Sequence, residues 1–149
     1  MESKKYLKKL GAQELGYRNG KQVTGGYFYI SKHAISFFPK LSKTILNDTI
    51  TLEFEVEHRN KPVFLNLVYH NDKFSKLSGS RDEYRIYLNR DIAPDDFFFR
   101  PNDIIVIERK DEHKYILEKF REGNKEYKRL VAIITNSKMR GQHSLTDNL

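Results

Sequence analysis

Carboxylates in the second half of the chain are the first residues to consider for catalysis. The sequence reads PND at residues 101–103 and ERK at residues 108–110, which are the residue types of the PD-(D/E)xK signature of metal-dependent nucleases. That chemistry requires two carboxylates on one divalent cation, with a lysine nearby. Asp103 and Glu108 have an odd separation on one predicted strand, so they point to opposite faces and lie ~16 Å apart. We therefore expect a turn before the strand and a solvated strand end after it, and no nuclease site.

Other motifs of enzymes and metal proteins are absent from the sequence. It contains no GxSxG, no HExxH and no phosphate-binding glycine loop. It has no Cys, which excludes disulfides and thiolate metal sites, and its five His residues lack the spacing of a metal site. We expect no catalytic residue, no metal and no cofactor in this chain, while its place in a larger enzyme stays open.

Two polar segments between predicted strands carry side chains that suit DNA recognition. Arg reads guanine, Asn and Gln read adenine, and Asp or Glu accept from the cytosine amino group. Lys and Ser serve phosphates. Acidic side chains inside a basic loop favour base reading over purely electrostatic binding, and the alternative is that both segments are ordinary solvated loops. The candidate DNA-binding residues are Gln13, Tyr17, Arg18, Asn19, Lys21, Gln22, Lys73, Lys76, Ser78, Ser80, Arg81, Asp82, Glu83 and Arg85.

The overall charge points to a polyanionic partner. Lys and Arg outnumber Asp and Glu by 27 to 20, and the pI is about 9.5. This balance favours nucleic acid first and an anionic membrane second, with simple solubility as the alternative. No apolar run approaches the roughly 18 residues that span a bilayer, and the amino end lacks the apolar region of a signal peptide. We expect a cytoplasmic protein that binds double-stranded DNA and no membrane.

Strands are predicted to position the two polar segments. In residues 49–58 every second side chain is apolar, and residues 61–71 repeat the pattern, which predicts a long antiparallel hairpin. Other segments carry strand signals too, and we expect about seven strands in all. They lie near the amino end and at residues 26–31, 84–89, 103–110, 114–120 and 126–135.

Helix signals are few. Ser31 caps a short predicted helix over residues 32–38, and a second short helix is predicted within residues 91–99. Many strands with two short helices at crossovers indicate a mainly-β fold, a small open barrel or pseudobarrel. We expect one domain over residues 1–138 and a polar tail over residues 139–149, where periodicity is lost.

Two runs of phenylalanine adjoin the predicted helices. Phe37-Phe38 and Phe97-Phe98-Phe99 have the chemistry to stack on bases, but each run abuts a short predicted helix and a proline. Because most large aromatic side chains are core anchors, we predict that both runs pack in the core.

Three stretches, in order, resemble the DNA-binding pseudobarrel domain of type II restriction endonucleases, of the EcoRII amino-terminal and BfiI carboxy-terminal kind. The first is LGYRNGKQVTGGYFYISKHAISFFPKLS, which has a polar arm, a glycine, an aromatic strand, an SK helix and FFP. The second is KLSGSRDEYRIY and the third is RPNDIIVIERKDEHKYILEKF. The matches recur over roughly residues 10–135. This family shares its fold with plant B3-type transcription-factor domains.

The resemblance implies a seven-stranded open barrel with two short helices and two arms that enter the major groove of DNA. Carried onto this chain, the N-arm is about residues 13–24 and the C-arm about residues 73–85. The resemblance also implies that the arms read a short asymmetric site. We then expect Arg18, Asn19, Arg81, Asp82 and Glu83 to read bases and Lys21, Lys73, Lys76 and Ser80 to contact phosphates.

The resemblance leaves the nuclease outside this chain. Enzymes of the family pair this domain with a separate nuclease domain, for which 149 residues leave no room. We expect a stand-alone binding protein, a separate specificity subunit, or a piece of a larger type II restriction endonuclease. Two other classes stay open: a small metal-dependent nuclease with an atypical site, and a protein-interaction barrel.

Overall fold

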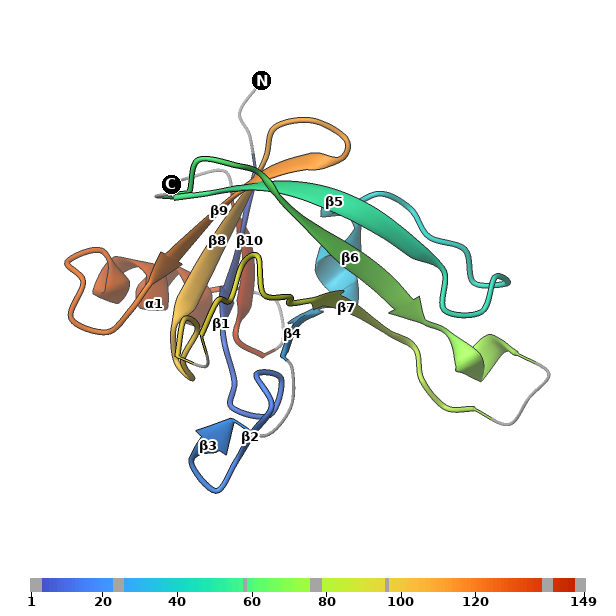
Figure 1. Ribbon diagram of the computed structural model, residues 1–149, viewed down its shortest axis with the longest axis horizontal. Helices are drawn as coiled ribbons and strands as arrows, with labels where there is room; N and C mark the ends of the chain where they lie inside the picture. The colour runs from blue at the N-terminus through green and yellow to red at the C-terminus, as the bar shows by residue number, and fades with distance from the viewer. Residues whose placement is uncertain are drawn as a thin grey trace.

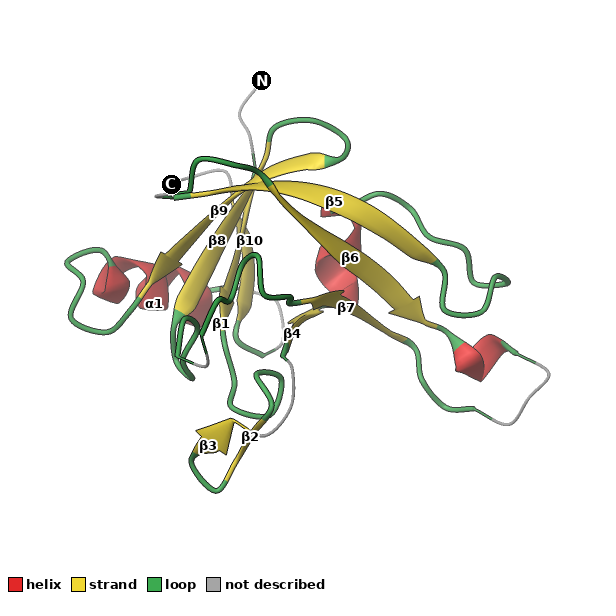
Figure 2. Cartoon of the chain, in the orientation of Figure 1, coloured by secondary structure: helices red, strands yellow, loops and turns green. Residues whose placement is uncertain are grey.

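The computed structural model describes residues 4–22, 26–57, 59–75, 79–95, 97–137 and 141–146. Within them, eight strands form one curled open sheet and two short strands form a separate hairpin (Figures 1 and 2). The strands are β1 (Lys5–Lys9), β2 (Tyr17–Arg18), β3 (Lys21–Gln22), β4 (Tyr27–Ile30), β5 (Thr49–Val56), β6 (Val63–His70), β7 (Glu83–Tyr87), β8 (Ile104–Arg109), β9 (Lys114–Phe120) and β10 (His143–Thr146). The helices are the 3₁₀ turns η1 (Lys32–Phe37) and η2 (Asp72–Phe74) and the α-helix α1 (Tyr127–Thr135).

The large sheet is an open pseudobarrel. Its strand order is β10-β1-β8-β9-β5-β6-β7-β4, so β10 and β4 are its edges. Strands β5 and β9 pair in parallel, and the other neighbours pair antiparallel. The prediction of a mainly-β open pseudobarrel is confirmed, but the sheet contains eight strands rather than seven.

The β5–β6 hairpin follows the predicted alternation. Leu52 pairs with Leu65 and Phe54 with Val63, and all of these side chains are buried. The alternate positions of β5 point outward, which leaves Glu55 exposed. A strand with one buried and one solvated face needs this period of two.

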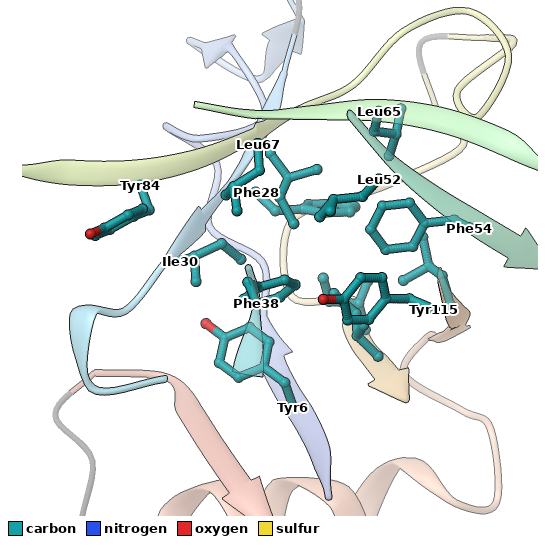
Figure 3. Packing of buried hydrophobic residues seen from close by; sticks show 14 of the residues in the cluster. Tyr6, Phe28, Ile30, Phe38, Leu52, Phe54, Leu65, Leu67, Tyr84 and Tyr115 are labelled. Carbon is teal, nitrogen blue, oxygen red and sulfur yellow. The ribbon is translucent and has the colours of Figure 1, made fainter. Parts of the chain in front are cut away.

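Aromatic side chains fill the concave side of the sheet (Figure 3). The ring of Tyr115 lies 5.3 Å from that of Phe38 and 5.5 Å from that of Phe54, between centroids. Burial of the ring raises the pKa of Tyr115 to about 12. Phe37 and Phe38 therefore pack in the core as predicted. In the second run Phe99 is buried, but Phe97 is 59% exposed, so the core prediction is wrong for Phe97.

The first predicted helix is confirmed as η1. The Ser31 side chain accepts a hydrogen bond from the backbone N–H of His33, 3.2 Å away, as a helix N-cap does. The second predicted helix is wrong, because residues 91–95 and 97–99 form turns and bends. There the side chain of Asp95 accepts from the backbone N–H of Phe97, an alternative to helical hydrogen bonding.

Residues 127–135 form α1 where we predicted a strand. Tyr127, Leu130 and Ile134 are buried at helical spacing and pack on a second apolar cluster, which includes Leu7 and Val106 from the outer face of β1 and β8. A strand in that place would leave this outer face in water. The helix thus covers strands that are apolar on both faces.

The predicted polar tail contains a strand. Within residues 141–146, which the structure describes, β10 pairs antiparallel with β1. His143 is buried there, and its Nδ1 and the Tyr6 hydroxyl are hydrogen-bonded. Burial, with a smaller contribution from Lys8, lowers the pKa of His143 to about 3. The boundary at residue 138 stays a prediction.

Candidate nucleic-acid interface

The two predicted arms project from the same side of the sheet. Figure 1 shows the β2–β3 hairpin at the bottom of the view and the described residues between η2 and β7 at the lower right, with β4 and β7 between them. The N-arm precedes β4, and the C-arm ends in β7. Because β4 and β7 pair antiparallel, the two arms enter this edge of the sheet at opposite ends of the ladder, the N-arm at Tyr27 beside Tyr87 and the C-arm at Glu83.

The N-arm is a tight β-hairpin. Tyr17 pairs with Gln22 and Arg18 with Lys21, and Asn19 and Gly20 form the turn with φ of 52° and 78°. Two consecutive residues with positive φ suit the turn that joins twisted strands, and Asn-Gly is the preferred pair. The turn leaves Arg18, Asn19 and Lys21 exposed at the tip.

A buried carboxylate fixes the base of the N-arm. Glu14 Oε1 accepts from the N–H of Gly11 at 2.7 Å and lies 3.1 Å from Lys8 Nζ, while Oε2 accepts from the N–H of Tyr29 at 2.8 Å. Lys8 is only 4% exposed. Burial lowers the pKa of Lys8, and Glu14 opposes that shift. No sequence pattern had singled out this pair.

The other N-arm candidates differ in their exposure and in their contacts within the protein. Gln13 is exposed. Gln22 Nε2 donates to the Leu15 carbonyl at 2.8 Å, and Tyr17 packs against the main core. Gln22 and Tyr17 therefore already have a role in holding the hairpin, whereas Arg18 donates only to the carbonyl of Tyr17 in the contacts that the structure records.

Asp72 closes the C-arm. Its carboxylate accepts from the Arg81 backbone N–H at 2.6 Å and from Arg81 Nε at 3.2 Å. The Lys73 N–H donates to the Arg81 carbonyl at 3.1 Å. Burial acts to raise the pKa of Asp72, but the hydrogen bonds from Arg81 lower it overall. A Cβ on Gly79 would lie 2.5 Å from the Asp72 side chain, so the closed arm requires glycine there.

Asp82 is held by two residues from outside the arm. Its Oδ1 accepts from the Tyr69 hydroxyl at 2.6 Å, and its Oδ2 lies 3.0 Å from Lys32 Nζ. Burial acts to raise the pKa of Asp82, but the bonds from Tyr69 and Lys32 outweigh it and lower the pKa. Tyr69 and Lys32 had not been predicted as site residues, and their sequence separation from Asp82 gave no signal.

A polar floor lies between the arms on the outward face of β6, β7 and β4. Arg85 Nη2 donates to Glu83 at 2.9 Å, and its guanidinium lies 4.2 Å from the centre of the Tyr27 ring. His70 Nε2 lies 2.6 Å from the Tyr87 hydroxyl. Burial, followed by Arg81 and Arg85, lowers the pKa of His70, which favours its neutral form. Arg85 Nε and His70 Nδ1 have no hydrogen-bond partner in the described part of the chain.

Of the remaining C-arm candidates, the structure describes only some. Lys73 and Ser80 are exposed, and the Lys73 ammonium lies 5.8 Å from the centre of the Phe74 ring. The predicted Lys76 and Ser78 lie outside the described residues. The structure engages Asp82, Glu83 and Arg85 in contacts within the protein, and DNA contact by any of the candidates stays a prediction.

The carboxylates first considered for catalysis have structural contacts. Asp103 is 1% exposed and accepts from Arg121 Nε at 3.0 Å and from the Arg100 N–H at 2.9 Å. Glu108 lies 3.7 Å from Lys5 Nζ. Asp103 therefore makes the predicted turn before β8. Among the described residues, no group of three or more His, Cys, Asp or Glu could hold a metal ion, and no helix is long and apolar enough to cross a membrane.

Comparison with solved structures identifies the fold. The amino-terminal domain of Helicobacter pylori LlaJI.R1 matches with a TM-score of 0.60 and 18% identity, over 96% of this chain and 97% of that chain. The UbaLAI restriction endonuclease B3 domain with cognate DNA matches with a TM-score of 0.57 and 14% identity, over 97% and 86%. The Arabidopsis FUS3–DNA complex matches with a TM-score of 0.50 and 12% identity, over 77% and 94%.

These matches define the class of protein as a B3-type fold. The predicted resemblance to B3-like pseudobarrel domains is confirmed at the level of the fold, and the structural neighbours include DNA-binding and restriction-endonuclease domains. No protein-family model and no curated protein sequence matches the chain.

Proposed function

We propose that this chain is the target-recognition domain of a type II restriction endonuclease system, and that it binds a specific sequence of double-stranded DNA. The observation that carries this proposal is the placement of two cation-bearing arms on one side of a B3-type sheet. The UbaLAI domain was solved with cognate DNA, and FUS3 was solved as a DNA complex. A shared fold together with these arms supports the same use of the surface here.

In this proposal the arms enter the major groove. The N-arm tip presents Arg18, Asn19 and Lys21 without an ion pair to any described carboxylate, so these side chains meet DNA without breaking an ion pair. A protonated arginine pairs bidentately with guanine, and asparagine with adenine. Lysines on both arms contact phosphates and supply the salt-dependent part of the affinity.

Selection of bound sequences from a random duplex library tests the proposal. A recognition domain enriches one short sequence motif, and the enrichment persists at physiological salt. Flat enrichment would overturn the proposal and favour the protein-interaction barrel, which predicts no sequence-dependent binding.

The nuclease is proposed to reside in a separate domain or subunit. Incubation of the pure chain with Mg²⁺ and plasmid DNA should leave the plasmid intact, because Asp103 and Glu108 are engaged with Arg121 and Lys5. Metal-dependent cleavage by the pure chain would contradict this part of the proposal and favour a small nuclease with an atypical site.

A further inference from the structure

A second basic site lies away from both arms. A hollow of about 1110 Å³ opens between the turn that joins β5 to β6 and the loop that joins β7 to β8. The β5–β6 turn precedes Val63 at the start of β6, whereas the C-arm follows His70 at its end, roughly 23 Å along the strand. Figure 1 shows that turn at the upper left, the N-arm at the bottom and the described part of the C-arm at the lower right. No described arm residue lines the hollow.

Positive side chains dominate the polar wall of this hollow. Arg59, Lys61, Arg90 and Lys119 line it, while Glu57 and Asp91 are its acidic residues within the described part of the chain. Lys61 and Arg90 are exposed at the rim, and Arg59 and Lys119 are partly buried.

Arg59 and Lys119 are held by an aromatic ring and by backbone carbonyls. The Lys119 ammonium lies 4.0 Å, and the Arg59 guanidinium 4.9 Å, from the centre of the Phe98 ring. Lys119 also donates to the Phe98 carbonyl. Arg59 donates to the carbonyls of Asp91 and Ile92 at 2.8 and 3.0 Å. These contacts orient both cations but leave their formal charge uncompensated.

Neither cation forms an ion pair with a carboxylate among the residues that the structure describes, although Asp103 and Asp95 act on Lys119 at longer range. The neighbouring Arg121 is different, because it pairs with Asp103 at 2.9 Å. Burial, followed by Arg121, lowers the pKa of Lys119. An anion in the hollow would relieve this repulsion and stabilise the charged form of Lys119.

We propose that this hollow binds a phosphate-bearing ligand of nucleotide size. Its volume of about 1110 Å³ slightly exceeds the ~300–1000 Å³ typical of small-molecule sites. A guanidinium fork and an ammonium are the usual pair of phosphate ligands. The apolar wall of Val56, Val63 and Leu117 suits the uncharged part of such a ligand. The proposal does not rest on DNA binding by the arms.

Titration calorimetry at low salt, with deoxyadenosine monophosphate as the probe, tests this site. Deoxyadenosine should not bind, and inorganic phosphate should compete with the nucleotide. Short single-stranded oligonucleotides, with and without a 5′-phosphate, distinguish a free nucleotide from a strand end as the natural source. Equal binding of the nucleoside, or tighter binding of an acidic peptide than of the nucleotide, would overturn the proposal.

Substitutions locate the binding. Lys119→Met should weaken nucleotide binding about tenfold, the loss expected for one charge-assisted hydrogen bond. Lys114→Met on the same strand, outside the hollow, should have no effect. Because Lys119 is partly buried, the exposed pair Lys61→Ser and Arg90→Ser provides a second variant that leaves the core untouched and should also weaken binding.

A readout on duplex DNA separates this proposal from the function proposed for the arms. Lys119→Met should keep the selectivity for duplex DNA, and Lys21→Ala should keep the nucleotide affinity. Full nucleotide affinity in both hollow variants would place the ligand elsewhere and overturn the proposal.

Discussion

The N-arm and the C-arm reach the same side of the sheet by different means. The N-arm takes its shape from its backbone, through the Asn19-Gly20 turn and the strand pairs around it. The C-arm depends on a side chain for its closure, since Asp72 accepts two hydrogen bonds from Arg81 beside the one backbone bond between Lys73 and Arg81. The N-arm cations are therefore left exposed, whereas the described C-arm charges are largely paired.

This difference separates the predicted base readers into two kinds. Arg18 and Asn19 are available at the N-arm tip without breaking a contact that shapes the arm. Asp82 and Glu83 already accept hydrogen bonds from Lys32 and Arg85, so a base contact by either carboxylate would compete with an internal ion pair. Acidic residues in a basic loop can thus serve the geometry of the loop, as well as base reading.

The largest effect is expected at the base of the N-arm. Glu14→Ala leaves Lys8 buried without its partner and should reduce the free energy of unfolding by about 3–5 kcal/mol, measured by urea denaturation. Asp82→Asn in the C-arm should cost less, because its partner Lys32 is exposed. The double variant Lys8→Met/Glu14→Gln removes both charges and should recover part of the loss. If Glu14→Ala lost no more unfolding free energy than Asp82→Asn, the proposed difference between the bases of the two arms would be refuted.

Next in size is the effect of removing the C-arm arginine. Arg81→Ala should cost about 1–3 kcal/mol of binding free energy on the selected duplex and relax one base position. Asp72→Asn keeps the arginine but weakens the closure of the arm, so it should leave the base preference unchanged. Unchanged selectivity in Arg81→Ala, measured by repeating the duplex selection, would count against a base contact by Arg81.

A smaller effect is expected from one lysine in each arm. Lys21→Ala and Lys73→Ala should weaken binding to all sequences alike and reduce the salt slope of the binding constant by about one unit each. Lys128→Ala on α1, exposed and outside both arms, is the matched control. If the two arm variants had the control's slope, phosphate contacts by these lysines would be excluded.

The smallest effect is expected for the pH dependence of stability that Asp82 causes in the C-arm. The pKa of Asp82 is lower in the folded protein than its ordinary value of 3.8. Its contribution to stability is therefore present above that value and is lost as pH falls below it. Because one partner is exposed, the contribution should be about 1 kcal/mol or less.

A urea-denaturation series across pH 3.8 checks this prediction. The stability difference between the original chain and Asp82→Asn should shrink as the pH falls. Lys21→Ala in the N-arm should show no such trend. If this stability difference grew as the pH fell, the predicted direction of the pH dependence would be wrong.

Local sequence signals were sufficient for much of the fold. Period two in residues 49–58 and 61–71 predicted the β5–β6 hairpin, and Ser31 predicted the start of η1. The Asn19-Gly20 pair was a further local signal, for the N-arm hairpin, that our sequence analysis did not use. These features depend on neighbours in the chain, so the sequence alone contains the information.

Features that depend on distant partners could not be predicted in the same way. The β-branched residues near Ile134 suggested a strand, and only the outer apolar cluster with Leu7 and Val106 explains why α1 forms there. The four consecutive apolar residues of β8, Ile104 to Ile107, were a usable sign in the sequence that both faces of that strand are covered, and all four are buried. Partners such as Tyr69 and Lys32 for Asp82 come from the folded sheet, and no spacing rule points to them.

The pairing of β4 with β7 also fixes the width of the gap between the arms. The N-arm leads into this ladder at Tyr27, which pairs with Tyr87, whereas the C-arm leads into it at Glu83. The two entry points are four steps of β7 apart, about 13 Å along the strand, close to the ~12 Å width of the major groove of B-DNA. A ladder lengthened by two residue pairs would keep its inward and outward faces and widen this gap by about 7 Å. If the arms bind DNA as proposed, the length of the β4–β7 ladder sets the width of the groove that they fit.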